Sequence, residues 1–150
     1  MINIRLFRPE DREKVSLLIR KTLIEENSKD YPQNVIDYMI NEFTGSFIQK
    51  MAEERTFLVA EKNEEIVGTA TLKNNYIGTV FIHPEFQSQG IGTKLMKKVE
   101  HLAKSRGLKN LTLDSSITGL GFYKRRGYEQ KEDIQDENYG KTYRMEKRIK

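Results

Sequence analysis

Residues 79–93 read TVFIHPEFQSQGIGT, and this stretch decides how the rest of the chain is interpreted. Its first four residues are β-branched or aromatic and predict a strand, which Pro84 ends because proline has no amide for a ladder hydrogen bond. A polar turn containing Gly90 and Gly92 follows, and then an amphipathic segment that predicts a helix. Backbone amides and the positive end of the helix dipole meet at this turn, which favours an anion such as a phosphate or pyrophosphate.

The glycine spacing separates this turn from the common nucleotide-binding motifs. A Rossmann fingerprint needs a third glycine where Leu95 stands, and a P-loop needs a Gly-Lys-Ser/Thr ending that is missing. The lack of β-carbons at Gly90 and Gly92 would let a ligand oxygen approach the backbone closely. A tight turn that binds no ligand is the alternative interpretation.

The composition indicates a single domain spanning residues 1–150. The chain is 37% hydrophobic and 32% charged, which suits one core with a well-solvated surface. It contains no cysteine, so a disulfide, a thiol nucleophile and a cysteine-ligated zinc are excluded. Its two histidines, His83 and His101, are too far apart in sequence to predict a metal centre. Because no apolar run has signal-peptide or membrane-spanning length, we expect a soluble, cytoplasmic protein without a membrane partner.

The charge is mildly basic, with a formal net charge of +4 and a pI of about 9.2. This suits an anionic ligand but does not by itself indicate nucleic acid. The cluster Lys124, Arg125 and Arg126 raises nucleic-acid binding as one hypothesis. The acidic residues 129–137 adjoin that cluster and argue against it, so we expect no nucleic-acid partner.

Apolar spacing predicts about seven strands and about four helices. Strands are expected at residues 2–6, 55–61, 66–72, 76–83, 108–113, from Tyr128 onward and 142–149. Helices are expected at residues 8–25, 31–51 with a break at Gly45, 90–106 and 115–126, and residues 134–139 are expected to form an acidic loop. Short turns predict an antiparallel meander for the second to fourth strands, and the helix crossover predicts a fifth strand parallel to the fourth.

Two motifs in this order resemble the GNAT N-acetyltransferases. Gln87, Gly90 and Gly92 match the family signature Gln/Arg-x-x-Gly-x-Gly/Ala, which follows a strand and a proline. The segment 122–128, FYKRRGY, is similar to the family ending Phe-Tyr-x-x-x-Gly-Phe/Tyr. The resemblance covers essentially the whole chain and implies an α+β fold: a mixed, largely antiparallel sheet that splays between its fourth and fifth strands.

The resemblance also implies an acetyl-coenzyme A site. The backbone of Val80, Phe81 and Ile82 is expected to bind the pantetheine arm, with one amide polarising the acetyl carbonyl. Gln87 of the signature is expected to belong to the coenzyme site, and the pyrophosphate is expected on the loop and helix start, at Ser88, Gln89, Gly90, Ile91, Gly92 and Thr93. Tyr123 corresponds to the family tyrosine that protonates the departing thiolate, a transfer that ordinary thiol and phenol pKa values permit. The alternative for Tyr123 is a packed aromatic without a catalytic role.

Two positions depart from the family pattern. Ser116 stands where many relatives have an asparagine that contacts the coenzyme, and Tyr76 and Leu111 stand near positions where some relatives have a glutamate as general base. The base is therefore open among Glu61, His83, Asp114 and a water chain. The acceptor is expected beside the first two helices, where Glu26, Tyr31 and Tyr38 are candidates to bind a cationic amine. Solvated charges on a helix face are the alternative.

These parts predict that an acetyl group moves from acetyl-coenzyme A to a primary amine. The amine attacks the thioester directly in a ternary complex, without a covalent enzyme intermediate and without a metal. The acceptor, a small molecule or a protein, and the use of other acyl groups stay open, as does the choice between monomer and homodimer. The alternative function is a catalytically silent module on the same fold that senses acyl-coenzyme A or binds another protein.

Overall fold

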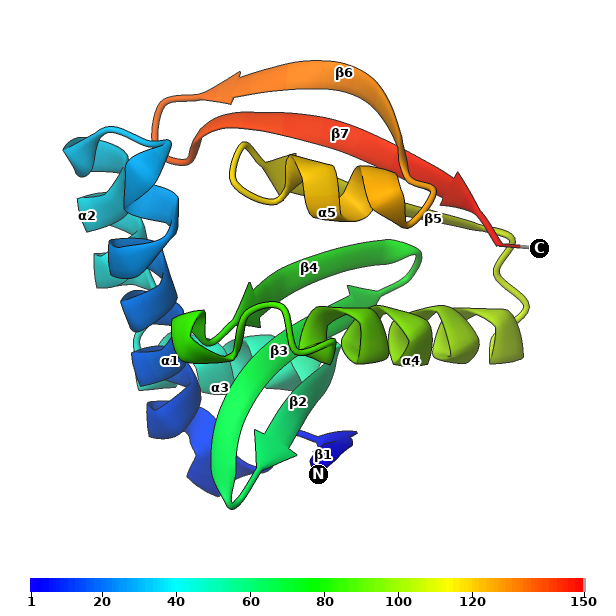
Figure 1. Ribbon diagram of the computed structural model, residues 1–150, viewed down its shortest axis with the longest axis horizontal. Helices are drawn as coiled ribbons and strands as arrows, with labels where there is room; N and C mark the ends of the chain where they lie inside the picture. Colours follow the sequence, from blue (N-terminus) through cyan, green and yellow to red (C-terminus); the bar gives the residue numbers. More distant parts are fainter. Residues whose placement is uncertain (150) are drawn as a thin grey trace.

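The computed structural model describes residues 1–149, which form a seven-stranded sheet in the order β1-β2-β3-β4-β5-β7-β6 (Figure 1). The strands are β1 (Ile2–Leu6), β2 (Thr56–Lys62), β3 (Glu65–Lys73), β4 (Tyr76–Ile82), β5 (Asn110–Ser116), β6 (Glu129–Asp136) and β7 (Gly140–Arg148). The α-helices are α1 (Arg12–Glu25), α2 (Gln33–Glu42), α3 (Gly45–Glu54), α4 (Ile91–Ser105) and the short α5 (Leu120–Arg125). The mixed, largely antiparallel sheet expected from the sequence is confirmed.

Tight turns join β2, β3 and β4 into the antiparallel meander that the sequence predicts. Asn63 and Glu64 in the first turn and Asn74 in the second have positive φ angles of 52°, 65° and 54°. Two-residue hairpins require this left-handed conformation because it matches the twist of the flanking strands. The register then pairs each strand with its neighbour along the chain, and β1 adds to β2 at the outer edge.

Helices cover both faces of the first four strands, with α1 and α3 on one face and α4 on the other (Figure 1). Alternation along β2 explains the two layers: Phe57 and Val59 pack with α1 and α3, whereas Leu58 and Ala60 pack with α4. Gly68 of β3 lies directly beneath α4, and a β-carbon there would come within 2.9 Å of a leucine side chain of that helix. The missing side chain at Gly68 therefore allows α4 to pack closely on β3.

The sheet opens between β4 and β5. Only two residue pairs join these parallel strands, Tyr76 with Thr112 and Ile77 with Leu113. Beyond Ile77, β4 continues alongside β3, whereas β5 continues alongside β7. The splay between the fourth and fifth strands is therefore confirmed, and it leaves one edge of β4 without a strand partner.

Two sequence-based boundaries in the last third of the chain are wrong. We expected a helix from Ser115, but β5 continues to Ser116 because β7 pairs with it along this whole length, and α5 begins only at Leu120. We expected an acidic loop at 134–139, but β6 continues to Asp136. This strand lies at the edge of the sheet and is mostly exposed. Its residues are therefore mostly charged and lack the apolar alternation that would have predicted a strand, although they pair with β7.

Within residues 1–149, no helix combines the length and the apolar character needed to span a membrane. In the same residues, no three acidic or histidine side chains gather in an arrangement that could hold a metal ion.

Candidate active site

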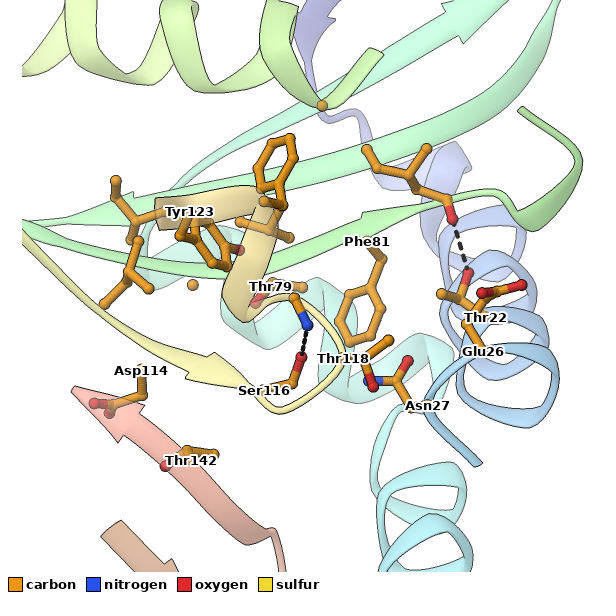
Figure 2. A pocket seen from close by; sticks show the side chains of 18 of the residues that line it. Thr22, Glu26, Asn27, Thr79, Phe81, Asp114, Ser116, Thr118, Tyr123 and Thr142 are labelled. Carbon is orange, nitrogen blue, oxygen red and sulfur yellow. Dashed lines mark hydrogen bonds between the residues drawn. The ribbon is translucent and has the colours of Figure 1, made fainter. Parts of the chain in front are cut away.

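A cavity of about 1020 Å³ occupies the opening between β4 and β5. One end reaches the start of α4, and the other reaches α1, α2 and the β6–β7 hairpin. Figure 2 shows that its side chains come from both halves of the sheet: Thr79 and Phe81 from β4, Asp114 and Ser116 from β5, and Tyr123 from α5. Ligand sites in proteins commonly have volumes of about 300–1,000 Å³, so this cavity can accept an extended ligand.

The open edge of β4 presents backbone groups to this cavity. Thr79 has a left-handed φ of 51°, and the register with β3 slips at this point, so β4 carries a bulge. Beyond the bulge, the amide of His83 donates to Val67 of β3 at 2.9 Å. Because backbone groups alternate in direction along a strand, the amides of Val80 and Ile82 point the opposite way, toward the opening. These are two of the three strand residues expected to bind a pantetheine arm.

The hydroxyls of two buried threonines on β3 satisfy the carbonyl groups that the bulge displaces. Thr69 donates to the carbonyl of Thr79 at 2.7 Å, and Thr71 donates to the carbonyl of Gly78 at 2.9 Å. A buried carbonyl without a partner would cost about 1–3 kcal/mol, so these two hydroxyls stabilise the irregular backbone. The bulge is therefore held from the β3 side while the opposite edge stays free.

The loop before α4 adopts the conformation that its glycine pattern predicts. Ser88 and Gly90 have left-handed φ angles of 66° and 81°, and nothing lies within 4 Å of where a β-carbon on Gly90 would be. The side-chain amide of Gln87 donates to the carbonyl of Ile82 at 2.9 Å, which fixes the loop to the end of β4. The first turn of α4, which includes Gly92 and Thr93, thus lines the cavity, and its backbone amides have no partner within the helix.

One residue of this loop points elsewhere. Gln89 does not line the cavity, and its side-chain oxygen accepts a hydrogen bond from Lys62 at 3.1 Å. Lys62 also lies over the ring of Phe86, at 5.4 Å from its centroid. The side chain of Gln89 therefore braces the loop against β2, whereas Ser88, Gly90 and Ile91 line the cavity.

Tyr123 of α5 lines the cavity. It is 8% exposed, and its ring contacts those of Phe122 and Tyr128 in edge-to-face arrangements. Burial raises the pKa of the phenol above its ordinary value of 10, and no hydrogen bond from residues 1–149 lowers it. The group is therefore a neutral phenol that holds a transferable proton beside the cavity.

On β5, Asp114 belongs to a hydrogen-bonded network. Its carboxylate accepts from two guanidinium nitrogens of Arg144 and from the hydroxyl of Tyr76, at 3.1 Å for the tyrosine. Burial, followed by the neighbouring carboxylate, raises the pKa of Tyr76 to about 12. Farther along β5, the hydroxyl of Ser116 accepts from the amide of Gly119 at 3.0 Å (Figure 2). Ser116 thus lines the cavity and also fixes the turn into α5.

The three side chains considered as general base are placed differently. Asp114 lines the cavity. Glu61 lies outside it, beside Arg5 on the outer strands. His83 is buried outside it as well, where its Nδ1 accepts from the amide of Glu85 at 3.1 Å. His83 therefore caps a short turn after β4, and neither Glu61 nor His83 reaches the site directly.

The three residues expected to bind the acceptor amine also occupy different environments. Glu26 lines the cavity at the end of α1 (Figure 2). The hydroxyl of Tyr31 donates to the carbonyl of Lys141 and accepts from the amide of Ile117 at 2.9 Å, so it joins three segments. Tyr38 lies outside the cavity, where its ring supports that of Tyr139 at 5.5 Å.

Sequence reasoning missed five charged residues that line the cavity: Glu42, Arg55, Arg125, Arg126 and Asp136. Glu42 accepts hydrogen bonds from the hydroxyl of Tyr139 at 2.6 and 2.7 Å, a contact across 97 positions that no local pattern signals. Arg55 donates to the hydroxyl of Thr71 at 3.4 Å. A signal did exist for Arg126, because it lies inside the FYKRRGY motif next to the predicted catalytic tyrosine.

Comparison with known proteins agrees with this geometry. The family model described as "Acetyltransferase (GNAT) domain" matches residues 23–149. The chain is 28% identical over 144 residues to a peptidyl-lysine N-acetyltransferase, YjaB, of Salmonella typhimurium, covering 95% of this chain and 94% of the relative.

Solved structures show the same fold. A GCN5-related N-acetyltransferase from Rhodopseudomonas palustris superimposes with a TM-score of 0.89 at 24% identity, covering 97% of this chain and 94% of the other. The PaiA N-acetyltransferase from Thermoplasma acidophilum, solved in complex with coenzyme A, gives a TM-score of 0.86 at 21% identity and 99% coverage of both chains. Because the family model spans most of the chain, and the fold and the cavity agree with it, this protein belongs to the GNAT family of acetyltransferases.

Proposed function

We propose that this protein transfers an acetyl group from acetyl-coenzyme A to a cationic primary amine. The observation that carries the proposal is the unpaired edge of β4, which leads directly to the free amides at the start of α4. An extended thioester arm needs backbone partners along its length, and a pyrophosphate needs amide donors at its end. The two features adjoin in one cavity of about 1020 Å³.

The residues that line the cavity fit the donor substrate. The amides of Val80 and Ile82 are positioned to bind the arm, and the segment from Ser88 to Thr93 is positioned to bind the pyrophosphate. Open space around Gly90 admits a phosphate oxygen close to the backbone. The coenzyme A complex of the PaiA neighbour, which shares the fold, supports this placement.

Two groups of the chain assist the chemistry. The donor supplies an acetyl group already activated as a thioester. The amide of Val80, held by the bulge, stabilises negative charge on the carbonyl oxygen, and such an amide donor is worth about 10²–10³ in rate. Tyr123 holds the proton that the sulfur needs on leaving, and the tyrosinate that this transfer leaves takes a new proton from water, because burial raises its pKa far above neutral pH.

The acceptor end of the cavity carries negative charge. Glu26 and Glu42 line it, near the hydroxyl of Tyr139. Carboxylates attract an ammonium group, and the loss of its proton to water or to a carboxylate releases the amine for direct attack in a ternary complex. Glu26 is the better candidate base, since the oxygens of Asp114 already accept from Arg144 and Tyr76. The peptidyl-lysine relative supports a lysine side chain as acceptor.

The test is thiol release from acetyl-coenzyme A in the presence of different amines: a lysine peptide with a blocked α-amine, a polyamine, an aminoglycoside and a neutral amine. We expect release with cationic primary amines, together with an acetylated product detected by mass spectrometry. Release with no amine in the panel, despite binding of acetyl-coenzyme A, would contradict transfer and indicate a binding module.

A matched pair of variants tests the acceptor site. Glu26→Gln is expected to raise the KM for the cationic amine by about tenfold, because a charged hydrogen-bond partner is lost, and to lower kcat, because the candidate base is lost. Glu25→Gln removes the neighbouring carboxylate, which pairs with Lys21 and does not line the cavity, so the KM should not change. Equal effects of the two substitutions would remove Glu26 from the acceptor site.

A further inference from the structure

Arg126 is a cation of the cavity that the proposed chemistry does not use. Its guanidinium lies over the ring of Phe122, with 4.5 Å between the guanidinium carbon and the ring centroid. Its Nε atom is buried and has no hydrogen-bond partner among residues 1–149. Within these residues, no carboxylate lies within 4.0 Å of its guanidinium nitrogens. Arg126 is therefore a cation that stacking holds in place and that has no anionic partner in the described part of the chain, so it can bind an anionic ligand.

The position of Phe122 links this cation to the start of α4. A β-carbon on Gly92 would lie 2.9 Å from two atoms of the Phe122 ring, so the ring packs against the first turn of α4. Arg126 stacks on this same ring and also lines the cavity. Stacking therefore positions the guanidinium near the free amides of that helix.

The surrounding charges favour an anion at this end of the cavity. Arg125, the residue before Arg126, also lines the cavity, whereas the carboxylates Glu26 and Glu42 lie at the acceptor end. The nearby carboxylate of Glu100 accepts hydrogen bonds from Lys147 and from the hydroxyl of Tyr128, so these groups rather than Arg126 are its partners. The helix dipole adds positive potential at the same place.

We propose that Arg126, held by Phe122 against the first turn of α4, binds a phosphate group of the donor coenzyme. The inference rests on the proposed use of acetyl-coenzyme A. It assigns to this chain a phosphate contact outside the loop 87–93. A planar guanidinium suits a phosphate because it offers parallel donors to two oxygens.

The experiment is isothermal titration of acetyl-coenzyme A and of its analogue lacking the 3′-phosphate. Arg126→Met keeps most of the stem on the Phe122 ring but removes the charge, and we expect about tenfold weaker binding of acetyl-coenzyme A and a shallower salt dependence. Lys124→Met is the matched control, because Lys124 is exposed in α5, two residues before Arg126, and does not line the cavity. Its affinity should stay within about twofold of the wild type.

The analogue identifies which phosphate is bound. If Arg126→Met weakens only acetyl-coenzyme A, the contact is to the 3′-phosphate; if it weakens both compounds equally, the contact is to the pyrophosphate. Wild-type affinity of a folded Arg126→Met protein for both compounds would overturn the inference. Failure of the wild-type protein to bind either compound would instead overturn the proposed function. Should Arg126→Met not fold, Phe122→Leu removes the stacking partner and is expected to weaken binding in the same direction.

Discussion

The ring of Phe122 fills the space that a side chain at Gly92 would occupy: a β-carbon there would lie 2.9 Å from two ring atoms. The second glycine of the signature therefore has a packing role in this chain, because it lets α5 approach the first turn of α4. Gly90 has a different role. The space around it is open, but its left-handed φ of 81° is a backbone conformation that glycine adopts without strain.

Replacing Gly92 by alanine should disturb this contact. Overpacking of this kind lowers the free energy of unfolding by about 1–3 kcal/mol. The better helix propensity of alanine offsets up to about 1 kcal/mol of this loss. Urea unfolding should therefore show a lower stability that Phe122→Leu partly restores in the double variant. Gly121→Ala is the matched control, because a β-carbon there meets only an arginine side-chain nitrogen at 3.2 Å. Additive effects of Gly92→Ala and Phe122→Leu would contradict the contact.

A carboxylate in the first turn of α4 should exclude the donor without harming the fold. Thr93 lines the cavity in that turn, where an aspartate is favourable to the helix dipole. We expect Thr93→Asp to keep the melting temperature but to lose the rise that acetyl-coenzyme A gives the wild type. Thr93→Asn, which is nearly identical in shape and neutral, should retain most of the rise. Full binding by Thr93→Asp would place the pyrophosphate elsewhere.

Removing the Tyr123 hydroxyl should slow turnover and leave donor binding nearly unchanged. General acid catalysis contributes about 10²–10⁴ in rate, so a loss in that range is expected for the kcat of Tyr123→Phe. Tyr128→Phe is the control, since its hydroxyl bonds Glu100 at 2.8 Å and only stability should fall. Because burial raises the pKa of Tyr123 above 10, the phenol stays protonated, and its deprotonation should not limit kcat below that pH. Unchanged turnover in Tyr123→Phe would remove it from the mechanism.

Tyr31 should prove structural. Tyr31→Phe leaves the amide of Ile117 and the carbonyl of Lys141 without their hydroxyl partner, which should cost about 1–3 kcal/mol in urea unfolding. The KM for the amine should not change. Tyr123→Phe is the stability control, because that hydroxyl has no hydrogen bond with residues 1–149. A raised KM with unchanged stability would return Tyr31 to the acceptor site.

The parts of the site predicted from sequence are those encoded locally. The left-handed turn at Ser88 and Gly90, the strand before it and the helix after it depend on neighbouring residues, so their pattern is visible in the chain. Tyr123 was located by its motif, and it does line the cavity.

The parts that were missed depend on packing between distant segments. The bond from Tyr139 to Glu42 spans 97 positions, and Tyr31 reaches Lys141 across 110. Neither contact leaves a periodic trace in the sequence. The same holds for β6, whose charged residues are compatible with a strand only because β7 pairs with it along one edge.

The donor is expected to lie along the open edge of β4 and to end at the start of α4. Amide chemical-shift mapping of the labelled protein during titration with acetyl-coenzyme A locates it residue by residue. We predict that the largest saturable changes fall on Val80, Ile82 and residues 88–93. Saturable changes confined to other surfaces, or no changes at saturating acetyl-coenzyme A, would contradict this placement of the donor.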